Sequence, residues 1–319
     1  MSFSGNVKEE LTGRVGRERH CQIAEVAAIT MLACEVHETK HGKYFIKLYT
    51  ENARIARKYF TLLKKAFNIT AGVMVRRRKT GRTAQSYLLW VQDSEEVRRV
   101  LMAVKVISPD VQATLTMFPE NRLIIQKECC KRAFLRGAFL SVGSVSDPDK
   151  SYHFELVLDT PAWSRFFKEL ICDFGPDARI VKRGKHFVVY VKEAEGISEL
   201  LNLMEAHVSM MEFENVRILK EIGNVVNRRV NCETANLQKT VSSAVKQTED
   251  IRLIEDTVGL DSLSPALAEA ARARLKYPDL ALAELGKQMN PPVGKSGMNH
   301  RLRKLAELAE DLRAHGAVR

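Results

Sequence analysis

The segment 295–319 sets amide, hydroxyl and basic side chains between regularly spaced apolar residues. The apolar spacing predicts an amphipathic helix with Ser296 as its N-cap and an end near His315. Its buried seam would be Met298, Leu302, Leu305, Ala309 and Leu312. Its open side would present Ser296, Gly297, Asn299, His300 and Arg303, with Arg301 and Lys304 flanking.

These side-chain types suit contacts with a nucleic acid. An asparagine such as Asn299 can form two hydrogen bonds with adenine, and an arginine such as Arg303 can do so with guanine. Lys295 and Ser296, together with the free N–H groups of a helix N-terminus, suit phosphate. His300 fits a phosphate contact and a structural role equally well. We therefore predict that this helix reads the major groove of double-stranded DNA.

The preceding residues predict the elements that would hold this helix. Ser264 followed by Pro265 is typical of a helix start, and the pattern continues to about Lys276. A short helix is predicted over 280–289, followed by a turn over 290–294 that contains two prolines. Such an order is typical of helix-turn-helix DNA-binding domains. A three-helix module for protein contacts is the alternative, although residues 287–319 hold seven basic and three acidic side chains.

The net charge of +11 is spread along the 319 residues. Residues 222–248 hold four basic side chains and one acidic one, whereas 249–286 hold four basic and eight acidic ones. In the first stretch, a solvated helix face explains the polar residues as well as phosphate contact does; the candidates for that contact are Arg228, Arg229, Asn231, Asn236 and Lys239. The same stretch predicts a buried helical row formed by Val226, Val230, Leu237, Val241 and Val245.

The first two thirds of the chain contain an internal repeat with a spacing of about 109 residues. Segments 24–34 and 133–143 are apolar helices with small residues four apart, which lets two helix backbones approach closely. Each is followed by a predicted strand, a helix, a hairpin and a closing helix. Each half thus has the predicted order α-β-α-β-β-α, and the halves should pack about a pseudo-twofold axis through the small-residue helices.

The run from Leu135 to Ser144 resembles the core helix of LAGLIDADG homing endonucleases, and the two copies resemble their single-chain form. In that family the acidic residue before the final glycine binds a divalent metal for phosphodiester hydrolysis. The matching residues here are Val142 and, in the more degenerate first copy, Ala33, which offer no oxygen ligand. The resemblance therefore implies a scaffold without catalysis. An active nuclease that uses Glu35 or Asp147 is the alternative.

The six cysteines form no CxxC pair, and no histidine lies at zinc-finger spacing. Cys34, Cys130 and Cys172 have apolar neighbours, which is typical of small, reduced core residues. The adjacent Cys129 and Cys130 should point to different faces of a regular element and make a poor chelate. We predict neither a metal nor a cofactor.

The resemblance extends to the whole chain. The opening Ser2-Phe3-Ser4 with Val7-Lys8, the degenerate double repeat, the block 224–236 and the run from Lys295 to Leu302 together resemble the WhiA family of bacterial DNA-binding regulators. The resemblance implies an α+β fold with a LAGLIDADG-like double repeat over 1–221, a connecting helix and linker over 222–260, and an all-α helix-turn-helix domain similar to sigma-factor region 4 over 261–319.

The same resemblance implies a regulator of transcription in cell division, chromosome segregation or sporulation. Its partners would be DNA and, by extension, other transcription or division proteins. We expect a cytoplasmic, nucleoid-associated protein, since no apolar run approaches the ~20 residues of a membrane span. Lys8, Glu9 and Glu10 also interrupt the region where a signal peptide is apolar. No small-molecule substrate is indicated.

Two further alternatives stay open. The chain could act mainly as a protein-interaction hub with incidental DNA affinity. The basic loop from Arg76 to Lys79, with Arg82, could also bring the first domain into contact with DNA, although a solvated hairpin explains it equally well.

Overall fold

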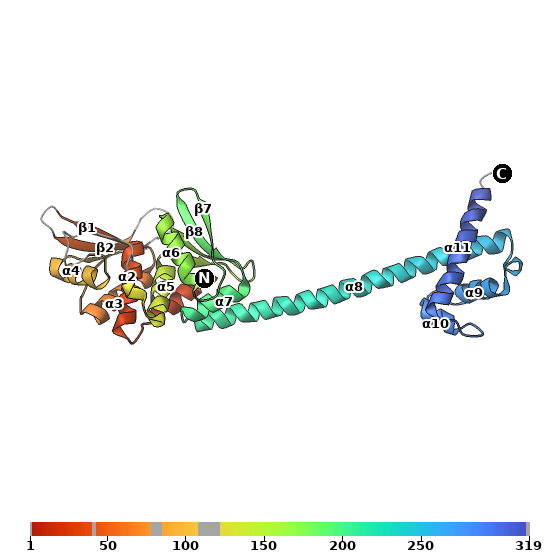
Figure 1. Cartoon of the computed structure of the whole chain (residues 1–319), viewed down its shortest axis with the longest axis horizontal. Coiled ribbons are helices and arrows are strands. Elements are labelled where there is room, and N and C mark those ends of the chain that lie inside the picture. The colour runs from red at the N-terminus through yellow and green to blue at the C-terminus, as the bar shows by residue number, and fades with distance from the viewer. Residues whose placement is uncertain (1, 40–42, 78–84, 108–121, 317–319) are drawn as a thin grey trace. The chain divides into compact units, whose positions relative to one another are not determined.

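The computed structural model describes residues 2–39, 43–77, 85–107 and 122–316 (Figure 1). The chain divides into two compact units, Met1–Lys220 and Glu221–Arg319. Each unit has its own apolar core. No helix in the described part of the chain is both long and apolar enough to cross a lipid bilayer.

The first unit contains two copies of one motif, each with a four-stranded antiparallel sheet. The first copy consists of α2 (Arg19–Ala33), β1 (Cys34–Glu38), β2 (Tyr44–Thr50), α3 (Ala53–Phe67), β3 (Gly72–Arg77), β4 (Gln85–Val91) and α4 (Ser94–Ala103). The second consists of α5 (Glu128–Val142), β5 (Gly143–Val145), β6 (Phe154–Leu158), α6 (Pro161–Cys172), β7 (Arg179–Arg183), β8 (His186–Val191) and α7 (Ala194–Leu203). The strand orders β1-β2-β4-β3 and β5-β6-β8-β7 are equivalent, which confirms the predicted repeat.

The predicted element order lacks one strand in each copy. β1 and β5 directly follow the central helices and pair antiparallel with β2 and β6. β5 has only three residues, and β1 has no buried position. β5 is therefore too short to show the alternation of apolar and polar residues that marks a strand in a sequence. In β1, Cys34 and Val36 do alternate with polar residues, but this short segment directly continues the predicted helix over 24–34.

Equivalent local signals start the helices that cover each sheet. The Asn52 side chain accepts a hydrogen bond from the Arg54 N–H at the start of α3 (2.9 Å). Thr160 accepts one from the Trp163 N–H at the start of α6, where Pro161 occupies the first helical position. Both residues cap N–H groups that have no partner within the helix.

The two small-residue helices, α2 and α5, pack side by side between the sheets (Figure 1). A Cβ added at Gly137 would lie 2.8 Å from the Glu25 carbonyl oxygen and 2.9 Å from Ala28 Cβ. These distances are shorter than ordinary van der Waals contact. The predicted close approach of the two backbones is therefore confirmed.

A buried carboxylate lies beside this contact. Glu25 of α2 is fully buried, and its Oε1 lies 3.0 Å from Lys58 Nζ of α3 and 3.1 Å from Arg136 Nε of α5. Arg136 Nη1 also lies 3.1 Å from Glu205 Oε2. Burial lowers the pKa of Lys58. Burial also acts to lower the pKa of Arg136, but the neighbouring carboxylates, Glu25 foremost, together outweigh it and raise that pKa. The group links three helices through charges that depend on one another, since each would be costly to bury alone.

The first helix, α1 (Phe3–Gly13), holds the start of the long helix α8 (His207–Thr257). The Glu10 carboxylate accepts hydrogen bonds from the N–H groups of Val208 and Ser209, both at 2.9 Å, and from the Ser209 hydroxyl at 2.8 Å. Glu10 thereby caps α8 with a negative charge at the positive end of the helix dipole. The ring of Phe3, from α1, also packs against the ring of Phe213, from α8, with centroids 6.2 Å apart.

The second unit contains the remainder of α8, the short η2 (Leu260–Ser262), α9 (Pro265–Lys276), α10 (Leu282–Lys287) and α11 (Lys295–Gly316). The three predicted helices after residue 264 are thus present. α10 is shorter than the predicted 280–289. The Met298 N–H donates to the Gly294 carbonyl at 3.0 Å. Ser296 therefore lies within α11 rather than at its N-cap.

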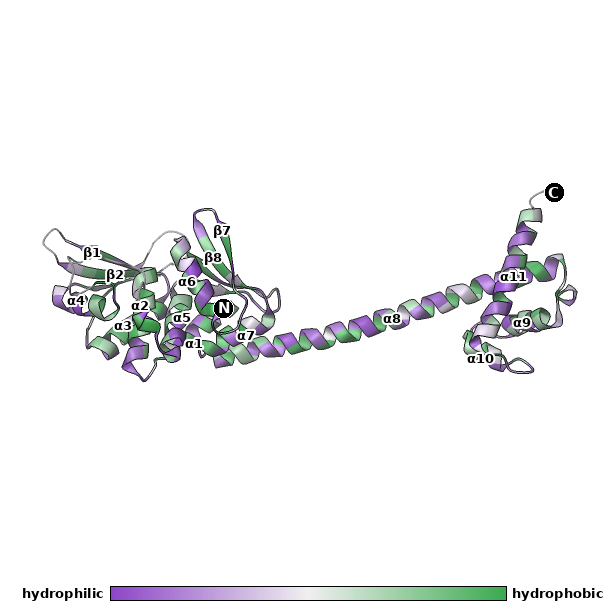
Figure 2. Ribbon diagram, in the orientation of Figure 1, coloured by the Kyte–Doolittle hydropathy of each residue, from purple (hydrophilic) through white to green (hydrophobic). Residues whose placement is uncertain are grey.

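The predicted buried row on α8 is wrong. Its five residues are each 52 to 65% exposed: Val226, Val230, Leu237, Val241 and Val245. Figure 2 shows green and purple residues alternating along α8. The periodicity correctly indicates a helix, but periodicity alone does not establish that a partner covers the apolar face.

We predict that Gly137→Ala lowers the free energy of unfolding of the first unit by about 1–3 kcal/mol. The added methyl group would overlap α2, and this overlap outweighs the gain of about 1 kcal/mol in helix propensity. Trp90 and Trp163 are the two tryptophans of the chain and both lie in this unit. Urea denaturation followed by tryptophan fluorescence therefore measures the effect.

The matched control is Gly13→Ala, at the end of α1, where an added Cβ meets nothing within 4 Å. We expect its transition to stay within about 0.5 kcal/mol of wild type. Equal stability of the two variants would show that α2 and α5 do not touch at Gly137.

Candidate nucleic-acid interface

The core of the second unit fixes one side of α11. Met298, Leu302, Leu305 and Ala309 are buried, and Leu312 is partly buried. The predicted seam is therefore confirmed. These residues pack with the end of α8 and with α9 and α10 in one apolar cluster. The opposite side of α11 is consequently presented outward at a fixed rotation.

A tight turn joins α10 to α11. The Val293 N–H donates to the Gly286 carbonyl at 2.9 Å, which folds the turn back on α10. A Cβ at Gly286 would overlap the Val293 carbonyl oxygen, and a Cβ at Gly297 would lie 2.6 Å from Val293 Cγ1. Asn290 N–H donates to Glu269 Oε1 at 2.8 Å and ties the turn to α9. The turn thus needs glycine at positions 286 and 297, where α10 and α11 pack against Val293.

The buried Arg274 secures the loop between α9 and α10. Its Nη1 donates to the carbonyl oxygens of Pro278 and Leu280, at 3.2 and 2.7 Å. Burial lowers the pKa of this guanidinium. These hydrogen bonds hold the start of α10 in place, and the Arg274 side chain is 2% exposed.

Most of the predicted contact residues lie on the open side of α11. Lys295, Ser296, Asn299, His300, Arg303 and Lys304 are all exposed. Arg303 Nε lies 3.3 Å from Glu307 Oε1, one turn further along. Both partners are more than half exposed, so this pair is weak and exchanges readily for another acceptor.

Two of the predicted contact residues have packing roles in the structure. Arg301 is partly buried, and its Nη1 lies 3.4 Å from the Ala266 carbonyl oxygen and 3.7 Å from Glu269 Oε2. It therefore joins α11 to α9 instead of flanking the open side. Gly297 is also partly buried, because the Val293 side chain packs against it.

Lys239 of α8, one of the predicted candidates for phosphate contact, lies beside the start of α11. Lys239 and Lys295 line one cavity of about 320 Å³ together with Ser243, Gln247 and Arg274. The sequence does not distinguish Lys239 from the other candidates on α8, because no local pattern shows which turn of α8 will lie beside α11.

Arg228 and Arg229 lie on α8 but not in this group. Ile251 is the first α8 residue in the apolar cluster under α11, and Arg228 precedes it by 23 residues. At a helical rise of 1.5 Å per residue, that separation is about 35 Å along α8. Arg229 pairs with Glu233 at 3.0 Å on an exposed surface.

The residues that would bind metal in a LAGLIDADG nuclease end the two central helices. α2 ends at Ala33 and α5 ends at Val142. At the end of α5, Lys8 Nζ donates to the Leu140 carbonyl at 3.3 Å. Burial lowers the pKa of Lys8. The end of α5 is thus in contact with an amine instead of a carboxylate.

The two carboxylates of the alternative nuclease site, Glu35 and Asp147, each interact with a residue close by in the chain. Glu35 is exposed on β1 and lies 3.3 Å from His37 Nε2. Asp147 Oδ1 accepts a hydrogen bond from the Asp149 N–H at 3.1 Å within a turn. The basic loop predicted around 76–82 extends from β3 into residues 78–84, which lie outside the described residues.

The cysteine predictions hold in part. Cys130 is buried and Cys34 is partly buried, but Cys172 is exposed at the end of α6, contrary to prediction. Cys129 and Cys130 do not diverge, because their sulfur atoms lie within 4.8 Å of each other and of Cys21 Sγ. Burial and the neighbouring Cys129 and Cys130 thiols raise the pKa of Cys21 to about 12.

The fold and this interface define a class of protein with a LAGLIDADG-like double repeat and a helix-turn-helix domain. Three family models match the chain: the WhiA N-terminal LAGLIDADG-like domain over residues 19–107, the WhiA LAGLIDADG-like domain over 131–223, and the WhiA C-terminal HTH domain over 226–309. The chain belongs to the WhiA family.

Close relatives span the same length. "Probable cell division protein WhiA" of Lachnoclostridium phytofermentans is 48% identical and covers 98% of this chain and 100% of its own. The protein of the same name from Alkaliphilus oremlandii is 45% identical, with 98% of each chain covered. The solved "full-length DUF199/WhiA from Thermatoga maritima" is 24% identical, with a TM-score of 0.59 over 98% of this chain and 99% of that one. This last likeness establishes the shared fold.

We predict that Gly286→Ala opens the turn between α10 and α11, because its methyl group would overlap the Val293 carbonyl. Hydrogen exchange of peptides from α11 should then be faster by about 5- to 150-fold, which corresponds to 1–3 kcal/mol of lost protection. Gly294→Ala is the control in the same turn, since its Cβ meets nothing within 4 Å. Unchanged exchange in the Gly286 variant would contradict the structure of the turn.

Proposed function

We propose that this protein is a non-enzymatic, sequence-preferring DNA-binding regulator of transcription, and that the first turns of α11 read the major groove. The observation that carries the proposal is the fixed rotation of α11. Its apolar seam is buried, whereas Asn299, His300 and Arg303 are exposed on the opposite side. A rigid helix that presents amide and guanidinium groups is what direct readout of base edges requires.

The roles divide by chemistry. Asn299 and Arg303 would read adenine and guanine, with Arg303 exchanging its exposed Glu307 partner for the base. Lys295, Ser296 and the free N–H groups at the start of α11 would bind phosphate, and Lys239 beside Lys295 would add a second ammonium group. Arg301 would act indirectly, by holding α11 against α9.

The first unit would serve as a scaffold without catalysis. Ala33 and Val142 provide no oxygen for a divalent cation, and Lys8 lies at the end of α5. We infer that DNA is bound and left uncut.

The relatives named for cell division support a role in that process. We extend the proposal to chromosome segregation or sporulation genes as targets, in a cytoplasmic protein that associates with the nucleoid.

The exposed apolar row on α8 favours a second candidate function, in which the chain is mainly a protein-interaction hub. Its DNA affinity would then be incidental, and its partners would be transcription or division proteins. The two functions predict different effects of substitutions on α11. A DNA reader should lose occupancy of its chromosomal sites, whereas an interaction hub should keep it.

We predict that Asn299→Ala and Arg303→Ala each weaken binding to the preferred site by about 1–3 kcal/mol and relax specificity at one base position. Lys295→Ala should instead weaken binding to all sequences and reduce the slope of log affinity against log salt by about one. Chromatin immunoprecipitation with sequencing would supply the site, and fluorescence anisotropy with the full chain would measure affinity at several salt concentrations.

The charge-matched control is Arg272→Ala, which removes an exposed arginine from α9 that pairs with Asp261. We expect its affinity and its salt slope to match wild type. Unchanged chromosomal occupancy of the Asn299 and Arg303 variants would refute DNA reading by α11 and support the interaction-hub function.

We also predict that the purified protein leaves supercoiled plasmid intact in Mg²⁺ or Mn²⁺, even when the plasmid carries the preferred site. The measurement is the conversion of supercoiled to nicked or linear DNA on a gel. Specific nicking that is abolished by Glu35→Ala or Asp147→Ala would overturn the non-enzymatic assignment.

A further inference from the structure

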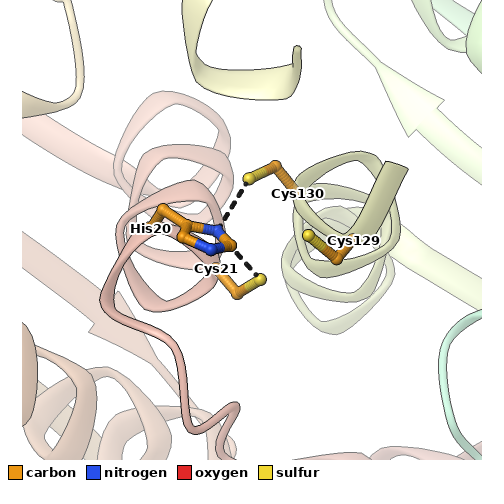
Figure 3. A group of neighbouring side chains, drawn as sticks. All are labelled: His20, Cys21, Cys129 and Cys130. Carbon is orange, nitrogen blue, oxygen red and sulfur yellow. Dashed lines mark hydrogen bonds between the residues drawn. The ribbon is translucent and has the colours of Figure 1, made fainter. Parts of the chain in front are cut away.

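Four metal-ligating side chains meet where α2 and α5 begin (Figure 3). They are His20 and Cys21 from the first turn of α2, and Cys129 and Cys130 from the first turn of α5. His20 Nδ1 lies 3.2 Å from Cys130 Sγ and 3.3 Å from Cys21 Sγ, and Figure 3 shows the imidazole between these two sulfurs. All four ligand atoms lie within 4.8 Å of one another, and no other such group occurs among the described residues.

The repeat itself brings these residues together. A shift of about 109 residues relates the two copies, and it places His20 on Cys129 and Cys21 on Cys130. Each central helix thus contributes two adjacent ligands from the same helical position. Because the helices pack side by side, the two pairs face each other across the pseudo-twofold axis. The sequence hides this convergence, since the pairs are far apart in the chain and neither has CxxC spacing.

The donor set and its spacing fit a tetrahedral zinc ion. Three thiolates and one imidazole form a known structural zinc set, with bonds of about 2.3 Å to sulfur and 2.0–2.1 Å to nitrogen. Ligand atoms on such a tetrahedron are about 3.5–3.8 Å apart. The observed separations lie around these values, since His20 Nδ1 is 3.2 and 3.3 Å from two of the sulfurs and no pair of ligand atoms is more than 4.8 Å apart. The four ligands would also close the coordination sphere, as structural zinc sites require.

The surroundings favour a bound cation with anionic ligands. Both helix N-termini lie at the cluster, and the positive ends of their dipoles favour the negative charge that three zinc-bound thiolates would carry. Three thiolates around Zn²⁺ leave one net negative charge, and Lys127 lines the adjoining cavity beside His20 and Cys130. That cavity, of about 260 Å³, provides a path for the ion, and Cys129 is exposed at the edge of the cluster.

We propose that His20, Cys21, Cys129 and Cys130 bind one structural zinc ion that joins the first turns of α2 and α5. The site lies at the opposite end of these helices from Ala33 and Val142. It is therefore distinct from the metal position of LAGLIDADG nucleases and serves to hold the two repeats together. Zinc would replace the thiol protons and add its binding free energy to the stability of the first unit.

The test uses the full chain, expressed in zinc-containing medium and purified in reducing buffer without chelator. Inductively coupled plasma mass spectrometry should find one zinc per chain. After zinc removal, titration with Co²⁺ should produce the intense visible bands of tetrahedral cobalt and the near-ultraviolet band of thiolate-to-cobalt charge transfer. Removal of zinc should lower the thermal midpoint that is followed by Trp90 and Trp163 fluorescence.

The decisive variants are Cys129→Ser and Cys130→Ser, with Cys172→Ser and Cys232→Ser as controls at exposed cysteines outside the cluster. Zinc and the cobalt bands should be lost from the first pair and kept in the second. Cys129 is exposed, so its variant should keep the wild-type tryptophan spectrum. Zinc at background level in the wild type, equal zinc in Cys129→Ser, or a Cys21–Cys130 disulfide in the reduced preparation would each overturn the proposal.

Discussion

The first unit depends on the close contact between α2 and α5. Gly137 allows the backbones to meet, and Glu25, at that contact, ties Arg136 of α5 to Lys58 of α3. The packing and the charges depend on each other. The helix contact buries the Glu25 carboxylate, and a buried carboxylate is stable only beside cations such as Lys58 and Arg136. With the helix axes fixed in this way, the position of each sheet and of each helix end follows. The same fixed contact brings three thiols and an imidazole together where α2 and α5 begin, and it places the aliphatic Ala33 and Val142 where the two helices end.

The fold was largely predictable, for physical reasons that differ between the units. The repeat could be recognised because matching helices carry small residues at matching positions, and α11 could be recognised because its apolar seam recurs at every turn. What escaped prediction depends on tertiary contacts. β1 and β5 exist because β2 and β6 pair with them, and Arg301 turns toward α9 because Glu269 and the Ala266 carbonyl are there. The exposed row on α8 and the convergence of Cys129 with Cys21 likewise depend on partners that are distant in the chain.

The distribution of basic residues is more informative than the net charge of +11. Lys58, Arg136 and Arg274 are buried and hold the protein together, so they contribute little to attraction at the surface. On α11 itself the exposed cations are Lys295, Arg303, Lys304 and Arg313, each at a fixed position on the helix. Recognition by this chain would accordingly depend on geometry more than on a broad electrostatic field, which fits sequence preference better than general affinity for polyanions.

The cap that Glu10 places on α8 gives the extreme N-terminus an unexpected importance. The matched family region begins at residue 19, so a truncation designed on that boundary would discard α1. It would expose the first N–H groups of α8 and the Phe213 ring, and it would leave Arg54 without its Glu9 partner. Residues 2–13 are therefore a structural part of the domain, and fusions or deletions for biochemical work are better placed elsewhere.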